Sequence, residues 1–220
     1  MAGGDAELII FDCDGVLTDS ERLAIKVDMA IMDELGLSLR EADVIELLMG
    51  RSDLETRREI EARLGRALPD TWQQEVDRRY REAFAAELTP VPGVVDALAQ
   101  VRLRTCVASS ATHQHLHYTL EMTGLYESFR GRIFSAEDVA AGKPAPDVFL
   151  HAAAQMGSAP ERCLVVEDSV NGVRAARAAG MRVLAFGGGM TPKHLLAGSD
   201  TVVFERMCEL PSLIERWNSK

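Results

Sequence analysis

The chain lacks three kinds of feature, and each absence excludes a class of protein. No apolar run approaches the roughly 18 residues that a membrane-spanning helix needs. The start at Met1–Glu7 is short, polar and acidic, which differs from a signal peptide. The four cysteines have no CxxC spacing, so a zinc site is disfavoured and reduced thiols in the cytoplasm are expected.

Basic residues are also scarce relative to acidic ones. The 220 residues contain 24 Lys and Arg against 34 Asp and Glu, which gives a net charge of −10. An acidic chain repels the phosphates of nucleic acid and of anionic membranes, so neither is an expected partner. An anionic substrate would need a local cation, either a metal ion or a few placed basic side chains.

The charged residues are unevenly distributed and indicate an inserted domain. Of the 70 residues from 19 to 88, 28 are charged, against 30 of the other 150. Apolar residues in this stretch recur at a period near 3.6, which is typical of amphipathic helices. Four helices are expected, near residues 23–35, 41–49, 53–64 and 70–86. Short links between them predict a small helical bundle.

Outside this stretch, short apolar runs alternate with helical segments. The runs lie at residues 7–11, 104–108, 132–134, 163–166, 182–186 and 201–204. This alternation predicts a parallel sheet with helices on both faces. The expected fold class is therefore α/β, with a Rossmann-like core of residues 1–18 and 90–220. A four-helix domain of residues 19–89 is inserted in its first crossover.

Polar side chains cluster where several of these strands end. They are Asp12 with Asp14, Ser109 with Ser110, Glu167 with Asp168, and a lone Lys143 before a predicted helix. In an open parallel sheet, ligands bind outside the carboxyl ends of the strands. Carboxylates, a lysine and a serine gathered there would form a site for a divalent metal and a phosphate group. Taken alone, the first acidic pair could equally be solvated turn residues.

In their order, these segments resemble the haloacid dehalogenase superfamily, in its phosphatase and phosphomutase branch with a helical cap. The matching segments are residues 12–21, 109–110, 142–147 and 167–172. The match spans nearly the whole chain and looks nearest to β-phosphoglucomutase and the small sugar-phosphate phosphatases. The resemblance implies that the four-helix insertion is the cap and that the remainder is the catalytic core.

The resemblance also implies a role for each residue of the cluster. Asp12 would be the nucleophile that forms an aspartyl-phosphate. Asp14 would protonate the leaving alcohol and then deprotonate the attacking water. Ser109 and the amide of Ser110 would bind the phosphoryl oxygens, and Lys143 would neutralise their charge.

The same resemblance implies a magnesium site and a contact from the cap. Mg²⁺ would be held by Asp12, the backbone carbonyl of Asp14, Asp168 and Glu167. Arg51, in a loop of the cap, would contact a second phosphate or a sugar hydroxyl of the substrate.

The resemblance favours a phosphatase that hydrolyses a small phosphate monoester, such as a sugar or sugar-alcohol phosphate. Asp14 argues against dehalogenation and phosphonate cleavage, for which the family pattern lacks this acid. Ala24 occupies the position of a histidine that the phosphomutases carry, which weakens that alternative. A non-catalytic phospho-acceptor or binding protein remains a further alternative.

We expect a monomer because the cap is evenly charged. Glu21 could contact the substrate or cap the first helix.

Three other features are interpreted as structural. His113, His115 and His117 are expected to be surface histidines rather than zinc ligands. Gly187–Gly189 are expected to form a flexible loop near the site, because the spacing of a nucleotide-binding loop is missing. Cys13 is expected to point away from the carboxylates on either side of it and to be a buried, inert thiol.

Overall fold

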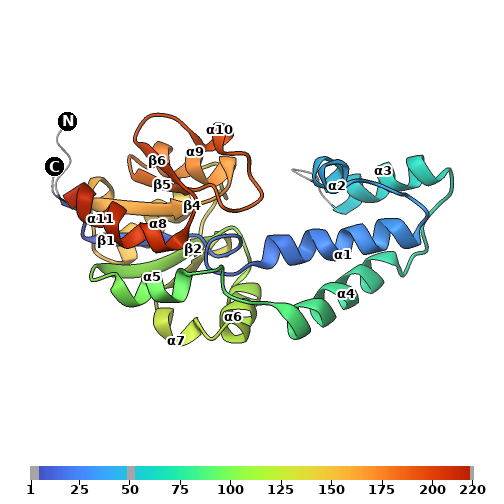
Figure 1. Ribbon diagram of the computed structural model, residues 1–220, viewed down its shortest axis with the longest axis horizontal. Coiled ribbons are helices and arrows are strands. Elements are labelled where there is room, and N and C mark those ends of the chain that lie inside the picture. Colours follow the sequence, from blue (N-terminus) through green and yellow to red (C-terminus); the bar gives the residue numbers. More distant parts are fainter. Residues whose placement is uncertain (1–4, 49–52, 219–220) are drawn as a thin grey trace. The chain divides into compact units, whose positions relative to one another are not determined.

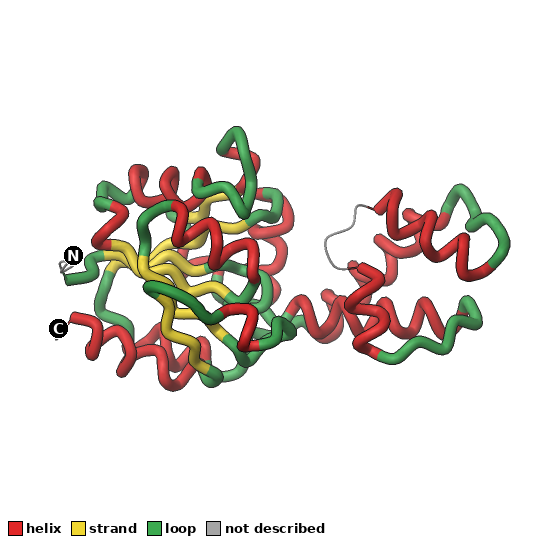
Figure 2. Tube along the Cα trace, turned by 90° about the horizontal axis from the view of Figure 1, so that it is seen from above, coloured by secondary structure: helices red, strands yellow, loops and turns green. Residues whose placement is uncertain are grey.

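The computed structural model describes residues 5–48 and 53–218, which belong to two compact units. One unit contains residues 1–20 and 89–220, and the other contains residues 21–88. The larger unit is an α/β structure, and the smaller one is entirely helical in its described part (Figures 1 and 2).

The larger unit is built on a parallel sheet with the strand order β3-β2-β1-β4-β5-β6 (Figure 1). Its strands are β1 (Leu8–Phe11), β2 (Arg104–Ser109), β3 (Ile133–Ser135), β4 (Cys163–Glu167), β5 (Arg182–Phe186) and β6 (Thr201–Phe204). Strand β1 pairs with β2 on one side and β4 on the other, so Phe11 lies opposite both Val107 and Val166. The chain order reverses at β1, and the carboxyl end of β1 is therefore where ligands bind in such sheets. The predicted fold class is confirmed.

Both faces of the sheet are covered by helices (Figure 2). Ile9 and Phe11 pack on one face, and Leu8 and Ile10 pack on the other. The first face is covered by α5 (Val94–Gln100), α6 (His113–Met122), α7 (Tyr126–Phe129) and α11 (Leu210–Asn218). The second is covered by α8 (Asp147–Gln155), α9 (Val170–Ala178) and α10 (Lys193–Leu196). Burial on both faces explains why the strands are continuous apolar runs rather than alternating patterns.

The smaller unit contains the four helices that the charge distribution and periodicity predict. They are α1 (Ser20–Glu34), which begins in the larger unit, α2 (Glu41–Leu48), α3 (Asp53–Leu64) and α4 (Trp72–Glu87). Their apolar faces form a separate core that includes Val27, Ile31, Val44, Leu47 and Ile60. Gly36 ends α1 with a φ of +84°, a conformation that costs glycine little.

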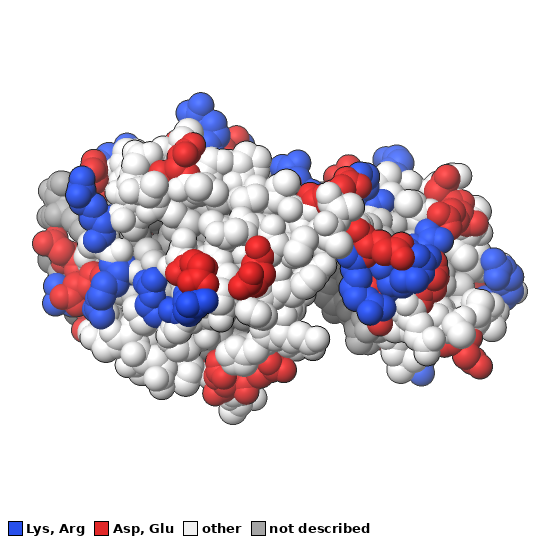
Figure 3. Space-filling model, turned by 90° about the horizontal axis from the view of Figure 1, so that it is seen from below, with Lys and Arg blue, Asp and Glu red and all other residues white. Residues whose placement is uncertain are grey.

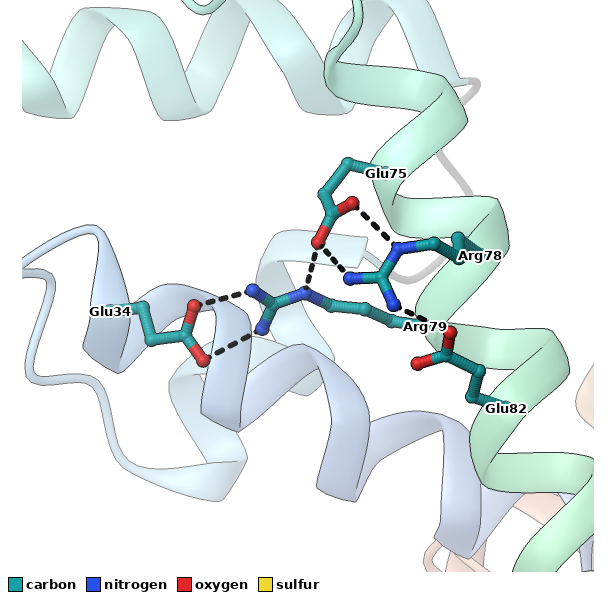
Figure 4. Close-up of polar contacts among 5 residues, drawn as sticks. All are labelled: Glu34, Glu75, Arg78, Arg79 and Glu82. Atoms are coloured by element: carbon teal, nitrogen blue, oxygen red, sulfur yellow. Dashed lines mark hydrogen bonds and ion pairs between the residues drawn. The ribbon is translucent and has the colours of Figure 1, made fainter.

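Charged side chains join α1 to α4 on the surface of this unit. Arg79 donates two hydrogen bonds to Glu34, at 2.7 and 2.6 Å, and a third to Glu75 (Figure 4). Arg78 bonds both Glu75 and Glu82, so the five residues form one network (Figure 4). On the face drawn in Figure 3, acidic and basic groups of this unit lie side by side rather than in separate patches. The positive charges of Arg78 and Arg79 are therefore neutralised locally by neighbouring carboxylates.

Candidate functional site

Asp12 is placed by the strand that precedes it. Strand β1 ends at Phe11, and the backbone N–H of Asp12 still donates to the carbonyl of Val166 at 2.9 Å. The chain then turns at Gly15, where φ is +78°, and the N–H of Gly15 donates to the carbonyl of Thr18. Asp12 is only 7 % exposed. A buried carboxylate at this position requires a compensating cation.

Lys143 supplies that positive charge. Its Nζ donates to Oδ1 of Asp12 at 2.5 Å and to Oε2 of Glu167 at 2.7 Å. The ammonium also lies 4.7 Å from the ring centroid of buried Phe149, where a cation–π contact adds to its attraction. Burial lowers the pKa of Lys143, but the two carboxylates more than offset this and hold the pKa above its usual value. Lys143 is therefore a fixed cation between two acids.

Asp12 and Asp14 sit two residues apart but in different electrostatic environments. Burial raises the pKa of Asp12 to about 8, although Lys143 opposes the shift. Burial also acts on Asp14, but hydrogen bonds from His115 and Ser20 outweigh it and hold the pKa of Asp14 below its ordinary value. The two carboxyl groups therefore differ in what surrounds them: Asp12 is buried beside Lys143, whereas Asp14 accepts hydrogen bonds from His115 and Ser20.

Glu167 and Asp168 lie at the end of β4, beside Asp12. Carboxylate oxygens of the three residues lie within 4.8 Å of one another, and all three residues are buried. Oε1 of Glu167 accepts from the backbone N–H groups of Asp168 and Ser169 and from the hydroxyl of Ser169. With Oε2 bonded to Lys143, both oxygens of Glu167 hold hydrogen bonds within the protein. Asp12 and Asp168 are thus better placed than Glu167 to hold a metal ion directly.

Two glycines make room for these carboxylates. A Cβ atom on Gly172, in the first turn of α9, would lie 1.9 Å from Cδ of Glu167. A Cβ atom on Gly189 would lie 3.2 Å from Oδ2 of Asp168, so the predicted glycine loop does approach the acidic cluster. At position 172 only a residue without a side chain allows this close an approach, and at position 189 a Cβ atom would be tight against Asp168.

The two serines at the end of β2 differ in burial. Ser109 is 2 % exposed, pairs with Ser135 of β3, and its Oγ accepts from the N–H of Ala111 at 3.2 Å. Ser110 is exposed. Ser109 is the last residue of β2 and Ser110 follows it, so both lie at the same edge of the sheet as Asp12. Of the other predicted site residues, Arg51 lies outside the described residues, and Glu21 lies in the first turn of α1.

His115 belongs to the site and was missed by the sequence reasoning. Its Nε2 lies 3.0 Å from Oδ1 of Asp14, and Nε2 is the donor because an ionised carboxylate only accepts. The interpretation as a surface histidine suits His113, which contacts Asp138, and exposed His117, which packs on Tyr126. The available signal was a helix separated from a strand end by only three residues, but this signal could not tell which histidine faces the sheet edge.

Cys13 is buried between the two aspartates. Its Sγ lies 3.8 Å from Oγ1 of Thr119 on α6, away from the acidic cluster. Burial and the negative charges of Asp14 and Asp12 raise the pKa of this thiol well above its ordinary value. A thiol that stays protonated is a poor nucleophile, so an inert role fits its surroundings.

Comparison with known proteins identifies the family. The model of the haloacid dehalogenase-like hydrolases matches residues 6–180. The chain belongs to this family. The resemblance inferred from the motifs is therefore confirmed, as is the prediction of an enzyme of the hydrolase class.

Several relatives in the haloacid dehalogenase-like family are named for a phosphatase activity. A 6-phosphogluconate phosphatase of Escherichia coli K12 is 28% identical over 94% of both chains. Hexitol phosphatase B of the same organism is 33% identical over 79% of this chain and 80% of its own. A solved haloacid dehalogenase-like protein of unknown function from Agrobacterium tumefaciens is 35% identical, with a TM-score of 0.84 over 96% of this chain and 98% of its own. Within the described residues, no helix is long and apolar enough to cross a membrane.

Proposed function

We propose that this hydrolase is a magnesium-dependent phosphatase that acts on a small phosphate monoester, in particular a sugar or sugar-alcohol phosphate. The observation that carries the proposal is the contact of Lys143 with both Asp12 and Glu167 beside Asp168, which joins a nucleophile, a fixed cation and metal-ligand oxygens. The phosphatase names of the relatives support the reaction class, and two of them suggest sugar-acid and hexitol phosphates as substrates.

In the first half-reaction, a carboxylate oxygen of Asp12 attacks phosphorus, and the bond from phosphorus to the ester oxygen breaks. Asp14 gives its proton to the departing alkoxide, which leaves as an alcohol. Lys143 stays within hydrogen-bond distance of Asp12 and offsets the charge of the phosphoryl group. Ser109 and the N–H of Ser110 bind its oxygens at the end of β2. Positioning and charge neutralisation supply most of the acceleration in such transfers.

In the second half-reaction, Asp14 accepts a proton from water as the water oxygen attacks the aspartyl-phosphate. The bond between phosphorus and the oxygen of Asp12 breaks, which releases inorganic phosphate and restores both side chains. Asp14 thus returns to its protonated state for the next cycle. This restored proton distinguishes an enzyme that turns over from a protein that only accepts a phosphate.

The acidic cluster fits Mg²⁺. Buried carboxylate oxygens within 4.8 Å of one another are hard ligands of the kind this ion prefers. Asp12, Asp168 and the backbone carbonyl of Asp14 would hold the ion directly, and Glu167 would hold it through water. Bound there, Mg²⁺ would neutralise negative charge on the phosphoryl group and on Asp12.

We assign residues 1–18 and 90–220 to the catalytic core and residues 19–89 to a cap that selects the substrate, with Arg51 as a substrate contact. The cysteines of the described residues are free thiols, which suits a cytoplasmic protein. The local pairing of opposite charges in the helical unit is compatible with a monomer whose partner is a small phosphorylated metabolite.

The test is release of inorganic phosphate from a panel of esters, with Mg²⁺ or with EDTA. The panel contains hexose phosphates, hexitol phosphates, 6-phosphogluconate, glycerol phosphates, phosphoglycolate and 4-nitrophenyl phosphate. Magnesium-dependent release that Asp12→Asn abolishes supports the proposal. Isomerised sugar phosphate without net release would indicate a phosphomutase. Phosphate uptake without turnover by the unsubstituted protein would indicate a phospho-acceptor.

A further inference from the structure

One side chain outside the family motifs contacts the proposed acid–base residue. His115 lies in the first turn of α6, which follows β2 after a short link and starts at the carboxyl edge of the sheet. Thr112 caps the helix, and its Oγ1 accepts from the backbone N–H of His115 at 3.2 Å. This cap fixes the backbone of His115, and its ring then reaches Oδ1 of Asp14 at 3.0 Å.

A second donor ends on the same oxygen. The hydroxyl of Ser20 donates to Oδ1 of Asp14 at 2.6 Å, and Thr18 donates to Ser20 at 3.3 Å. Among the described residues, no donor bonds Oδ2 of Asp14. The two oxygens of this carboxyl group are therefore unequal, since one is held by two donors and the other faces away from them.

This inequality fixes the orientation of the carboxyl group. Both hydrogen bonds end on Oδ1, so Oδ2 is the oxygen of Asp14 that no donor of the described residues occupies. A fixed orientation matters because proton transfer requires hydrogen-bond reach to the reacting oxygen.

We propose that His115 is a positioning residue for Asp14. This inference rests on the proposed phosphatase function. Together with Ser20, it holds Asp14 by Oδ1 and assigns the transferred proton to Oδ2. The other two histidines of the segment have different contacts, since His113 bonds Asp138 and His117 packs on Tyr126.

The test compares esters that differ in their need for an acid. An alkyl phosphate needs a proton on its leaving oxygen, whereas 4-nitrophenyl phosphate releases a stabilised phenolate. Under this proposal, kcat/KM of His115→Leu falls about 10- to 100-fold on the best alkyl phosphate of the panel, because part of the general-acid contribution is lost. On the aryl ester, kcat/KM stays within about two-fold of the unsubstituted enzyme. His115→Gln, whose amide can donate at a similar reach, recovers most of the loss on the alkyl ester.

Two further variants keep the test decisive. His113→Leu removes a histidine from the same turn and should leave both substrates unaffected. Ser20→Ala should show the same preference for the aryl ester as His115→Leu. It replaces His115→Leu as the test variant if His115→Leu does not fold. In an Asp14→Asn background, His115→Leu should add no further loss, because the group that it positions can no longer transfer a proton.

A loss of equal size on both esters, or no loss on either, would overturn the role of His115. These outcomes are distinct from failure of the proposed function. If the proposed function fails, the unsubstituted enzyme releases no phosphate from any ester with Mg²⁺. If only the role of His115 fails, the unsubstituted enzyme is active and the variants do not show the expected difference between the two esters.

Discussion

Asp28 should make the stability of the helical unit depend on pH. It lies in α1, is 6 % exposed, and accepts a hydrogen bond from the hydroxyl of Tyr80 at 2.5 Å. Burial raises its pKa from 3.8 to about 6, although the bond from Tyr80 opposes the shift. The folded state therefore binds a proton more tightly than the unfolded state does, so stability falls as pH rises between these two values. This difference in pKa between the folded and unfolded states corresponds to about 3 kcal/mol of unfolding free energy at pH 8.

The substitution Asp28→Asn removes the ionisation and keeps an oxygen that can accept from Tyr80. Its new amide group costs about 1 kcal/mol if it is left without a partner, but this cost is the same at every pH. The diagnostic quantity is the change in its effect with pH. Relative to the unsubstituted protein, the variant should gain about 2.5 kcal/mol in unfolding free energy between pH 4 and pH 8.

The assay is urea unfolding followed by tryptophan fluorescence at both pH values. The chain has two tryptophans, Trp72 in α4 and Trp217 in α11, so a Trp217→Phe background leaves the reporter in the helical unit. The matched control is Asp33→Asn, because Asp33 is exposed on the same helix. This substitution should change the unfolding free energy by the same amount at both pH values. If Asp28→Asn has the same effect at pH 4 and pH 8, burial does not disfavour its charge and the reasoning is refuted.

Three other predictions concern the site. Lys143→Met should lower the unfolding free energy by about 3–5 kcal/mol at neutral pH, because it leaves buried carboxylates without their cation. The same substitution should abolish phosphate release. Chemical denaturation measures the first effect and the ester assay measures the second. Gly172→Ala should cost about 1–3 kcal/mol because its methyl would overlap Glu167, whereas Gly142→Ala, with its nearest atom 3.8 Å away, should cost much less in the same denaturation experiment. Mg²⁺ at 100 times its Kd should raise the unfolding free energy by about 2.7 kcal/mol. Calorimetry should detect this increase, and the increase should be absent with EDTA or in Asp168→Asn.

The sequence predicted the sheet and its polar edge because both depend on local patterns. Apolar runs bounded by acids marked β1 and β4 to within a residue, and parallel pairing then required their carboxyl ends to meet. The ends of helices that depend on a single hydrogen bond are harder to predict from the sequence. Helix α9 begins at Val170 because Ser169 accepts from the N–H of Gly172 and caps the helix, and no apolar pattern marks this start.

His115 could not be predicted because its role depends on helix phase. Three histidines alternate in the sequence, and periodicity alone places His113 and His117 on one face of α6. Which face meets Asp14 is decided by the cap at Thr112 and by the packing of Leu116 and Leu120 against the sheet. Such a contact between distant segments follows from tertiary packing, which no local pattern encodes.

The alternation of β1 explains how one short segment delivers two reactive carboxyl groups and an inert thiol. Ile9, Phe11 and Cys13 belong to the same buried cluster, so the two-residue period of the strand continues past its hydrogen-bonded end. Asp12 instead contacts Lys143, and Asp14 contacts His115, whereas Cys13 packs against Thr119 of α6. A cysteine at position 13 is held in the apolar layer, and the carboxyl groups on either side of it further suppress its ionisation. The same backbone geometry that pairs the acids thus keeps the thiol out of the chemistry.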